Sequence, residues 1–175
     1  EAHSLSPGVL LSRLLASHMS KGYWSRGGAR AGTNGSALGN SSSEHAKAIN
    51  GVGVIARDWV TVLRKLTQRG DLEHLTMLPW SNVFSQRNLL RSTLVWCPGC
   101  YESQRLSGLS AYTPLIWMFN CVTLCTRHKR RLNSRCYCCG KRQHWLERRS
   151  VAGHCSKCGE WLGNKENTGD VVIVE

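Results

Sequence analysis

Apolar residues recur at helical spacing in two parts of the N-terminal half of the chain. The first part follows Ser6-Pro7, a pair that suits the start of a helix because serine caps an N-terminus and proline needs no hydrogen bond at the first helical position. The second part lies between Ile49 and Gln68 and shares one apolar face, formed by Val52, Ile55, Trp59, Val62, Leu63 and Leu66. The pattern predicts one helix running to about Met19 and a second ending near Gln68.

The residues after the second helix predict a tight turn and a shorter helix. Gly70 fits the left-handed residue that stops a helix, Asp71 can cap the next helix, and Pro79 ends it. Its apolar face is formed by leucines: Leu72, Leu75 and Leu78. The arrangement resembles a DNA-binding helix-turn-helix in outline. Because Asp71 and Glu73 stand where such a motif contacts DNA, packing or protein contact is at least as well supported as base reading.

All nine cysteines lie between Cys97 and Cys158, and most of them form pairs separated by two residues. Such a gap lets one tight turn aim two side chains at a zinc ion, which takes four sulfur or nitrogen ligands in structural sites. The spacing predicts two structural zinc ions, one held by Cys97, Cys100, Cys125 and His128, the other by Cys136, Cys139, Cys155 and Cys158. Cys121 is a competing ligand but is expected to be a buried thiol, and Cys138 is left unligated.

These patterns divide the chain into four parts. Residues 1–90 are expected to form a helical N-terminal domain, with a loop rich in glycine and serine at 20–43. Residues 91–132 form the first zinc module, residues 133–163 a second module of the zinc-ribbon type, and residues 164–175 a tail. The expected fold class is α+β: a small helical domain of helix-turn-helix type, followed by two small zinc-binding ribbon or knuckle modules.

The net charge of the chain indicates what kind of partner it binds. It carries 23 lysine and arginine residues against 11 acidic residues, a formal net charge of +12. Two zinc–thiolate sites would lower this charge by about three, and the remaining surplus indicates a polyanionic partner, with nucleic acid as the leading candidate. The predicted contacts to nucleic acid are the basic residues that surround the zinc ligands: Arg127, Lys129, Arg130, Arg131, Arg135, Lys141, Arg142, Arg148 and Arg149.

The motifs argue against catalysis. Both predicted zinc sites are closed by four protein ligands, whereas a catalytic zinc keeps one position for water. A zinc deaminase needs glutamate two residues after a histidine, and no histidine of this chain has one. A phosphate-binding loop of the Walker type is also absent from the sequence. The chain is therefore expected not to be an enzyme.

The sequence gives no indication of a membrane partner. No apolar run approaches the roughly 20 residues that span a bilayer. An odd number of cysteines without a charged-then-apolar leader favours reduced thiols over a secreted disulfide framework. The expected location is a bacterial cytoplasm, with association to the nucleoid when the protein is in complex.

Several short motifs, taken in order, resemble those of the TniQ family, the target-selection proteins of heteromeric and CRISPR-associated transposons. The expected match runs from Glu1 to about Gly163. Two departures lie beside the first zinc site, where Thr126 replaces the usual proline and Lys129 the usual glycine. The matching segments are His3-Ser4-Leu5-Ser6 for E-S-L-S, Leu75 to Trp80 for L-T-x-L-P-W, Trp96 to Cys100 for W-C-P-x-C, Cys125 to His128 for C-P-R-H, and Leu132 with Cys136 to Gly140 for L-x-x-x-C-x-x-C-G.

The resemblance implies a non-catalytic adaptor. Such a protein ties an AAA+ transposition ATPase to a CRISPR effector complex with its guide RNA, or to a target DNA site. For a chain of this length it implies the short, CRISPR-associated type. The helical part and first zinc module would contact the ATPase, and the basic zinc region the backbone of DNA or guide RNA; a homodimer stays open. Two alternatives remain: a stand-alone nucleic-acid-binding zinc-ribbon protein of transcription or RNA processing, and a redox protein using its Cys-x-x-Cys pairs.

Overall fold

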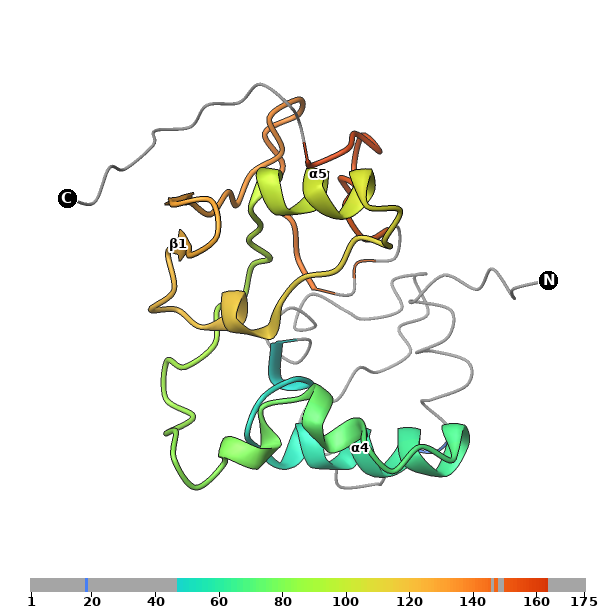
Figure 1. The fold of residues 1–175 in the computed structure, drawn as a ribbon. Coiled ribbons are helices and arrows are strands. Elements are labelled where there is room, and N and C mark those ends of the chain that lie inside the picture. Colours follow the sequence, from blue (N-terminus) through green and yellow to red (C-terminus); the bar gives the residue numbers. More distant parts are fainter. Residues whose placement is uncertain (1–17, 19–46, 146, 148–149, 164–175) are drawn as a thin grey trace, which may run out of the picture.

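The computed structural model describes residue 18, residues 47–145, residue 147 and residues 150–163. The predicted N-terminal helix, apart from residue 18, lies outside the described residues. So do the loop at 20–43 and the tail. The described part combines helices, short 3-10 turns and a small antiparallel sheet (Figure 1). This mixture of helix and sheet agrees with the expected α+β class. None of the helices in this part is long and apolar enough to cross a membrane.

Helix α4, Val54–Thr67, lies at the base of the molecule in Figure 1 and confirms the second predicted helix. Its buried face consists of Ala56, Trp59, Val60 and Val62. The helix ends at Gln68, which takes the left-handed conformation (φ 58°) and donates its N–H to the carbonyl of Arg64 over 3.0 Å. The predicted stop at Gly70 is therefore wrong, because Gln68 has already closed the helix two residues earlier.

The shorter helix predicted after Gly70 is replaced by two 3-10 turns, η3 (Leu72–Leu75) and η4 (Leu78–Trp80). Thr76 separates them, because its hydroxyl donates to the carbonyl of Glu73 (2.8 Å) and accepts the N–H of Leu78 (3.1 Å). A threonine that bonds nearby backbone groups in this way offers the chain an alternative to a continuous helix. Pro79 lies inside the second turn rather than ending a helix.

Asp71 does not cap η3. Its side chain makes no capping bond, and its carboxylate instead forms an ion pair with Arg69 at 2.6 Å. A four-residue 3-10 turn stands where a recognition helix would lie, so α4 and the segment after it do not form a helix-turn-helix. Leu72 and Leu78 pack against the buried face of α4 and hold this segment as a small packing unit.

The cysteine-rich part of the chain begins with helix α5, Pro98–Leu106, and continues through the 3-10 turn η5, Leu115–Met118. A two-stranded antiparallel sheet follows, formed by β1 (Leu124–Cys125) and β2 (Arg130–Arg131). Isolated bridges tie this part together, and two of them cross the predicted module boundary at residues 132 and 133. These are the bridges between Trp96 and Asn133 and between Thr93 and His144.

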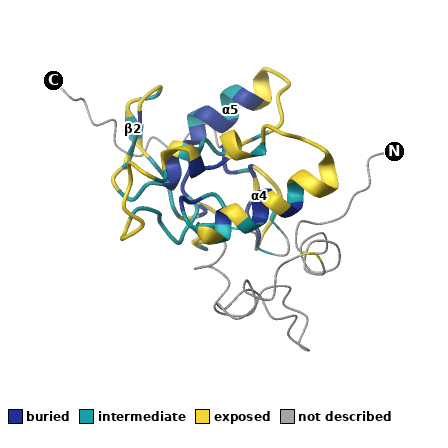
Figure 2. Ribbon diagram, turned by 90° about the horizontal axis from the view of Figure 1, so that it is seen from below, coloured by how far each residue is buried: buried dark blue, intermediate teal, exposed yellow. Residues whose placement is uncertain are grey.

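One buried cluster fills the space between the two predicted zinc modules. It contains Trp96, Tyr101, Trp117 and Leu162 together with metal-ligand cysteines of both sites. Figure 2 shows the dark face of α5 turned into this cluster, while the loop that follows the helix is exposed. Trp96, which directly precedes the first ligand, thus lies in a core that both sites share.

Candidate metal centres

The first predicted ligand set is assembled in the structure. The ligand atoms of Cys97, Cys100, Cys125 and His128 all lie within 4.8 Å of one another. Nδ1 of His128 lies 3.2 Å from Sγ of Cys100 and 3.6 Å from Sγ of Cys97, so Nδ1 is the nitrogen that faces the thiols. The Sγ atoms of Cys100 and Cys125 are 3.5 Å apart. Such separations match a tetrahedron with metal–sulfur bonds of about 2.3 Å.

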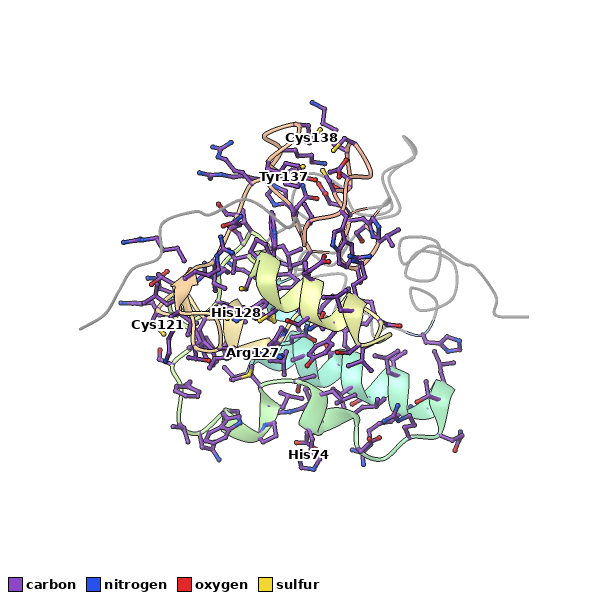
Figure 3. The ribbon with its side chains drawn as sticks, turned by 45° about the horizontal axis from the view of Figure 1, so that its top comes forward. His74, Cys121, Arg127, His128, Tyr137 and Cys138 are labelled. Carbon is purple, nitrogen blue, oxygen red and sulfur yellow. The ribbon has the colours of Figure 1, made fainter. Side chains whose placement is uncertain are left out.

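Three local features aim these side chains at one point. Cys97 is the N-cap of α5 and Cys100 lies in its first turn, where the helix dipole favours a thiolate. Cys125 ends β1, and His128 lies in the tight turn between the strands, beside Arg127 in Figure 3. The turn packs so closely on α5 that a Cβ at Gly99 would lie 2.9 Å from Cδ2 of His128.

The electrostatics of this site suit a metal cation. Burial raises the pKa values of the Cys97 and Cys100 thiols. Burial also acts to raise the pKa of Cys125, but backbone N–H groups, that of His128 first, outweigh it and the net shift is downward. Burial, with the charges of Arg127 and Arg130, lowers the pKa of His128. The site therefore holds a neutral imidazole and at least one thiol disposed to ionise.

The second predicted ligand set also comes together, from two knuckles of the same form. Cys136 and Cys158 have Sγ atoms 3.7 Å apart, and Cys139 and Cys155 have theirs 3.6 Å apart. The glycine after each knuckle has a left-handed conformation, with φ of 68° at Gly140 and 76° at Gly159. Each donates its N–H to the carbonyl of the first cysteine of its knuckle over 2.9 Å. The pairing of the four clusters is thus sequential, as expected.

Gln143 supports the second site and was not singled out by the sequence. It is almost fully buried, and its Nε2 donates to Sγ of Cys155 over 3.2 Å. Its Oε1 accepts the backbone N–H and the hydroxyl of Ser156, both over 2.9 Å. Groups that orient metal ligands in this way also tune their affinity. The only sequence signal was an uncharged polar residue between basic and aromatic neighbours.

The thiols of the second site differ in acidity. Burial raises the pKa of Cys136 to about 12. For Cys155, burial acts in the same direction, but backbone N–H groups of Cys158 and Lys157 outweigh it and the pKa falls to about 6. Cys155 is therefore the ligand most disposed to carry a negative charge before a metal arrives.

The two remaining cysteines lie outside both ligand sets. Cys138 is exposed, beside Tyr137 in Figure 3, and lies outside the second group of candidate ligands. Cys121 is also exposed, so the expected buried thiol is wrong. The cause lies in Arg91, whose guanidinium donates to three backbone carbonyls around Cys121 and thereby fixes the loop: those of Phe119, Asn120 and Val122.

The predicted nucleic-acid contacts fall into two groups. Arg127, Lys129, Arg130 and Arg131 lie on the β1–β2 hairpin, and all but the half-buried Arg130 are exposed. The second group flanks the first knuckle of the second site: Arg135, Lys141 and Arg142. Lys141 forms an ion pair with Glu147 at 2.8 Å, which reduces its availability to a phosphate. Arg148 and Arg149 lie outside the described residues.

Comparison with known proteins gives one family match. The TniQ family model matches residues 2–132, well over half of the chain. The matched segment contains α4, the 3-10 turns η3, η4 and η5, and the first ligand set. It stops before the second set, whereas the motif resemblance was expected to reach Gly163. No curated protein matches the chain significantly.

Proposed function

Because the chain belongs to the TniQ family, we propose that it is a non-catalytic adaptor in DNA transposition, linking target recognition to an AAA+ transposition ATPase. Membership of this family implies a role associated with transposition. One observation carries the finer proposal: the match includes the helical segment and the first four-ligand centre together, which are the parts assigned to partner contact. The target-recognition partner is a CRISPR effector complex with its guide RNA, or a target DNA site.

Both metal centres take zinc in this proposal and act as scaffold. Each offers four soft or borderline ligands in a closed set, the arrangement typical of structural zinc. A closed set keeps no position for a substrate or an activated water. This supports an adaptor over a metalloenzyme and makes the metal part of the folding energy.

The surface that contacts the ATPase lies on the helical segment. Trp80, in the segment that resembles L-T-x-L-P-W, is 52 % exposed, and Val83 beside it is 67 % exposed. Phe84 packs between the rings of Trp80 and Phe119, at centroid distances of 6.1 Å and 5.5 Å. Contiguous exposed apolar side chains with aromatic anchors are typical of protein interfaces.

The β1–β2 hairpin and the first knuckle of the second site contact nucleic acid in this proposal. Their arginines provide phosphate contacts, which give affinity without base specificity and weaken as salt rises. The surface is therefore suited to hold a DNA or guide-RNA backbone while a partner supplies the sequence reading.

Partner dependence tests the proposal. The zinc-loaded protein is mixed with the AAA+ ATPase of its own transposon, assembled on DNA, and co-sedimentation is measured. We expect binding, and a loss of at least about tenfold in Trp80→Ala, since interface aromatics commonly contribute 2 kcal/mol or more. Leu106→Ala, at a more exposed apolar site on α5 (74 %), is the control and should bind as the unaltered protein does.

The alternative function predicts the opposite binding result. A stand-alone zinc-ribbon protein of transcription or RNA processing would bind nucleic acid tightly by itself and show no affinity for the ATPase. The basic β1–β2 hairpin favours this alternative, so the same experiment also tests it. A metal-free, folded protein with dithiol activity would instead support the redox reading and remove the adaptor proposal.

A further inference from the structure

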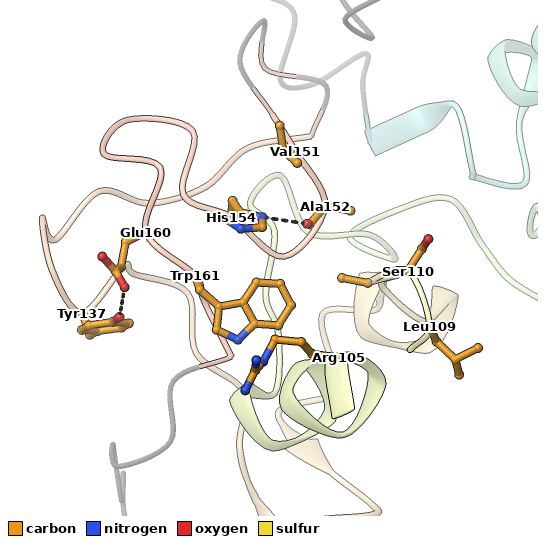
Figure 4. Close-up of a pocket in the computed structure, with 10 residues that line it drawn as sticks. Arg105, Leu109, Ser110, Tyr137, Val151, Ala152, His154, Glu160 and Trp161 are labelled. Carbon is orange, nitrogen blue, oxygen red and sulfur yellow. Dashed lines mark hydrogen bonds between the residues drawn. The ribbon is translucent and has the colours of Figure 1, made fainter. Parts of the chain in front are cut away.

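A hollow of about 730 Å³ lies between α5, the loop after it and the two knuckles of the second metal centre. Figure 4 shows Trp161 at its middle, with Arg105 on one side and His154 on the other. Its volume falls within the roughly 300–1,000 Å³ of small-ligand sites. Apolar and aromatic side chains predominate in its lining: Leu109, Ala111, Tyr137, Val151, Ala152 and Trp161. None of them belongs to the metal-ligand sets or to the basic surface described above.

The aromatic rings of the hollow are held in place before any ligand arrives. A Cβ at Gly153 would lie 2.3 Å from the ring of Trp161, so glycine allows the chain to press against the indole. The indole Nε1 donates to the carboxylate of Glu102 over 3.0 Å, and the ring of His154 packs edge-on at 5.0 Å. Rings fixed in this way lose little conformational entropy when a flat molecule stacks on them.

Tyr137 is the exposed ring of the set. It is 41 % exposed, and its hydroxyl donates to the carboxylate of Glu160 over 2.6 Å. An exposed ring, tethered at its far end, presents a fixed face toward solvent.

The polar groups of the hollow suit a base edge better than a phosphate. Glu160 brings a carboxylate that would repel a phosphate but can accept a hydrogen bond from an N–H group of a base, such as the ring N3–H of uracil. Arg105 lies beside the indole, but its guanidinium is paired with the carboxylate of Glu102 and adds little free positive charge. Phosphate-binding charge lies outside the hollow, on the exposed Arg135 and Arg142 that flank the same knuckle.

We propose that this hollow binds an unpaired base of a single-stranded nucleic acid, stacked on Tyr137, while the neighbouring phosphates lie on Arg135 and Arg142. Proteins that hold single strands combine a basic surface with aromatic platforms in this way. The inference rests on the proposed function, since it assumes that the basic surface carries nucleic acid. A peptide side chain would also fit an apolar hollow, but the net charge of +12 favours a polyanion.

The test compares single strands with duplexes on the full, zinc-loaded chain. Fluorescein-labelled oligo-uridylate and an RNA duplex with the same number of phosphates are titrated at fixed salt. In Tyr137→Leu we expect single-strand affinity to fall about 5- to 100-fold, the range for one lost stack, with duplex affinity unchanged. Tyr137→Phe keeps the ring and should bind as the unaltered protein does. A strand carrying 5-iodouridine should crosslink on irradiation to the peptide that contains Tyr137.

Each outcome decides the matter. If Tyr137→Leu leaves single-strand affinity unchanged, or lowers single-strand and duplex affinity equally, the hollow is not a base site; a peptide-binding hollow gives the first of these results. In either case, duplex binding that stays salt-dependent would leave the proposed function standing. If the unaltered chain binds neither the single strand nor the duplex, both the base-binding hollow and the proposed function are overturned. Should Tyr137→Leu lose its zinc, Val151→Glu at a 62 % exposed position places a charge in the hollow and carries the same expectations.

Discussion

The indole Nε1 of Trp96 donates a hydrogen bond to the backbone carbonyl of Leu162 over 3.0 Å. Trp96 directly precedes the first metal ligand, and Leu162 follows the last one, so this bond spans the whole cysteine-rich region. The backbone of Trp96 also exchanges hydrogen bonds with Asn133, at 2.9 Å and 2.7 Å. The two metal centres are therefore built on one frame.

Replacing Trp96 should destabilise this frame. In Trp96→Phe the carbonyl of Leu162 loses its partner in a buried setting, and the smaller ring leaves a void. We expect the free energy of unfolding in urea to fall by about 2–4 kcal/mol. Trp80→Phe, at a half-exposed position, should change it by no more than about 0.5 kcal/mol. Equal effects of the two substitutions would argue against the shared frame.

Loss of one ligand in the second site should reach beyond that site. Cys136→Ser should release at least one zinc ion and unfold the cysteine-rich region. The reason is that zinc binding contributes about 10 kcal/mol or more, which is comparable with the whole stability of a small domain. Metal content by mass spectrometry and the melting temperature measure this. Cys138→Ser, in the same knuckle but outside the ligand set, should keep both ions and an unchanged melting temperature. Retention of two ions in Cys136→Ser would contradict the ligand assignment.

Zinc affinity at the second site should rise with pH, because thiols must release protons to bind the metal. Cys136, with a pKa of about 12, still carries its proton at neutral pH, whereas Cys155, with a pKa of about 6, has already lost its proton. Above about pH 7 the logarithm of the binding constant should thus rise with pH by fewer than four protons per ion. Competition with a chromophoric chelator measures this slope. A slope of four would mean that Cys155 still carries its proton in this pH range, which would contradict its low pKa.

Lys129 occupies a backbone conformation that favours glycine. Its φ is 50°, in the turn between β1 and β2 where relatives of this chain are expected to carry glycine. Lys129→Gly should therefore raise the free energy of unfolding, by about 0.5–1 kcal/mol once the greater freedom of glycine in the unfolded chain is subtracted. Lys157→Gly removes the same charge from a residue without positive φ, and it should lower stability by a similar amount. Thermal unfolding of both variants distinguishes relief of strain from a general effect of charge.

The exposed arginines around the metal centres should set the salt dependence of nucleic-acid binding. We expect Arg131→Ala, Arg135→Ala and Arg142→Ala in combination to flatten the plot of log affinity against log salt by about two to three units on duplex DNA. The zinc content should not change. A control variant removes as much charge from the exposed face of α4, through Arg57→Ala, Arg64→Ala and Lys65→Ala, and should keep the original slope. A flattened slope in the control alone would move the nucleic-acid surface to α4.

The metal-ligand sets could be predicted from the sequence because each knuckle is a local structure. Two ligands separated by two residues must share one tight turn, and the left-handed Gly140 and Gly159 follow from the same local geometry. Helix α4 was predictable for a similar reason, since its apolar period is local.

The features that escaped prediction depend on contacts between distant segments or on competing local bonds. Nothing near Trp96 in the sequence indicates that Asn133 and Leu162 are its partners. The helix stop moved from Gly70 to Gln68, although glycine has the stronger intrinsic preference for the left-handed conformation. The threonine that divides η3 from η4 likewise overrides an apolar pattern that predicted a single helix.

The two knuckles of the second centre are a repeated backbone with divergent side chains. In each, the first cysteine donates its N–H to the carbonyl of the residue after the glycine, Lys141 in one and Glu160 in the other. The flanking bridges also correspond, Arg135 with Arg142 in the first knuckle and His154 with Trp161 in the second. One half of the repeat thus carries cations where the other carries aromatic rings and a carboxylate. The two knuckles are therefore alike in backbone and unlike in surface, so a ligand lying across both would meet cations at one end and aromatic rings with a carboxylate at the other.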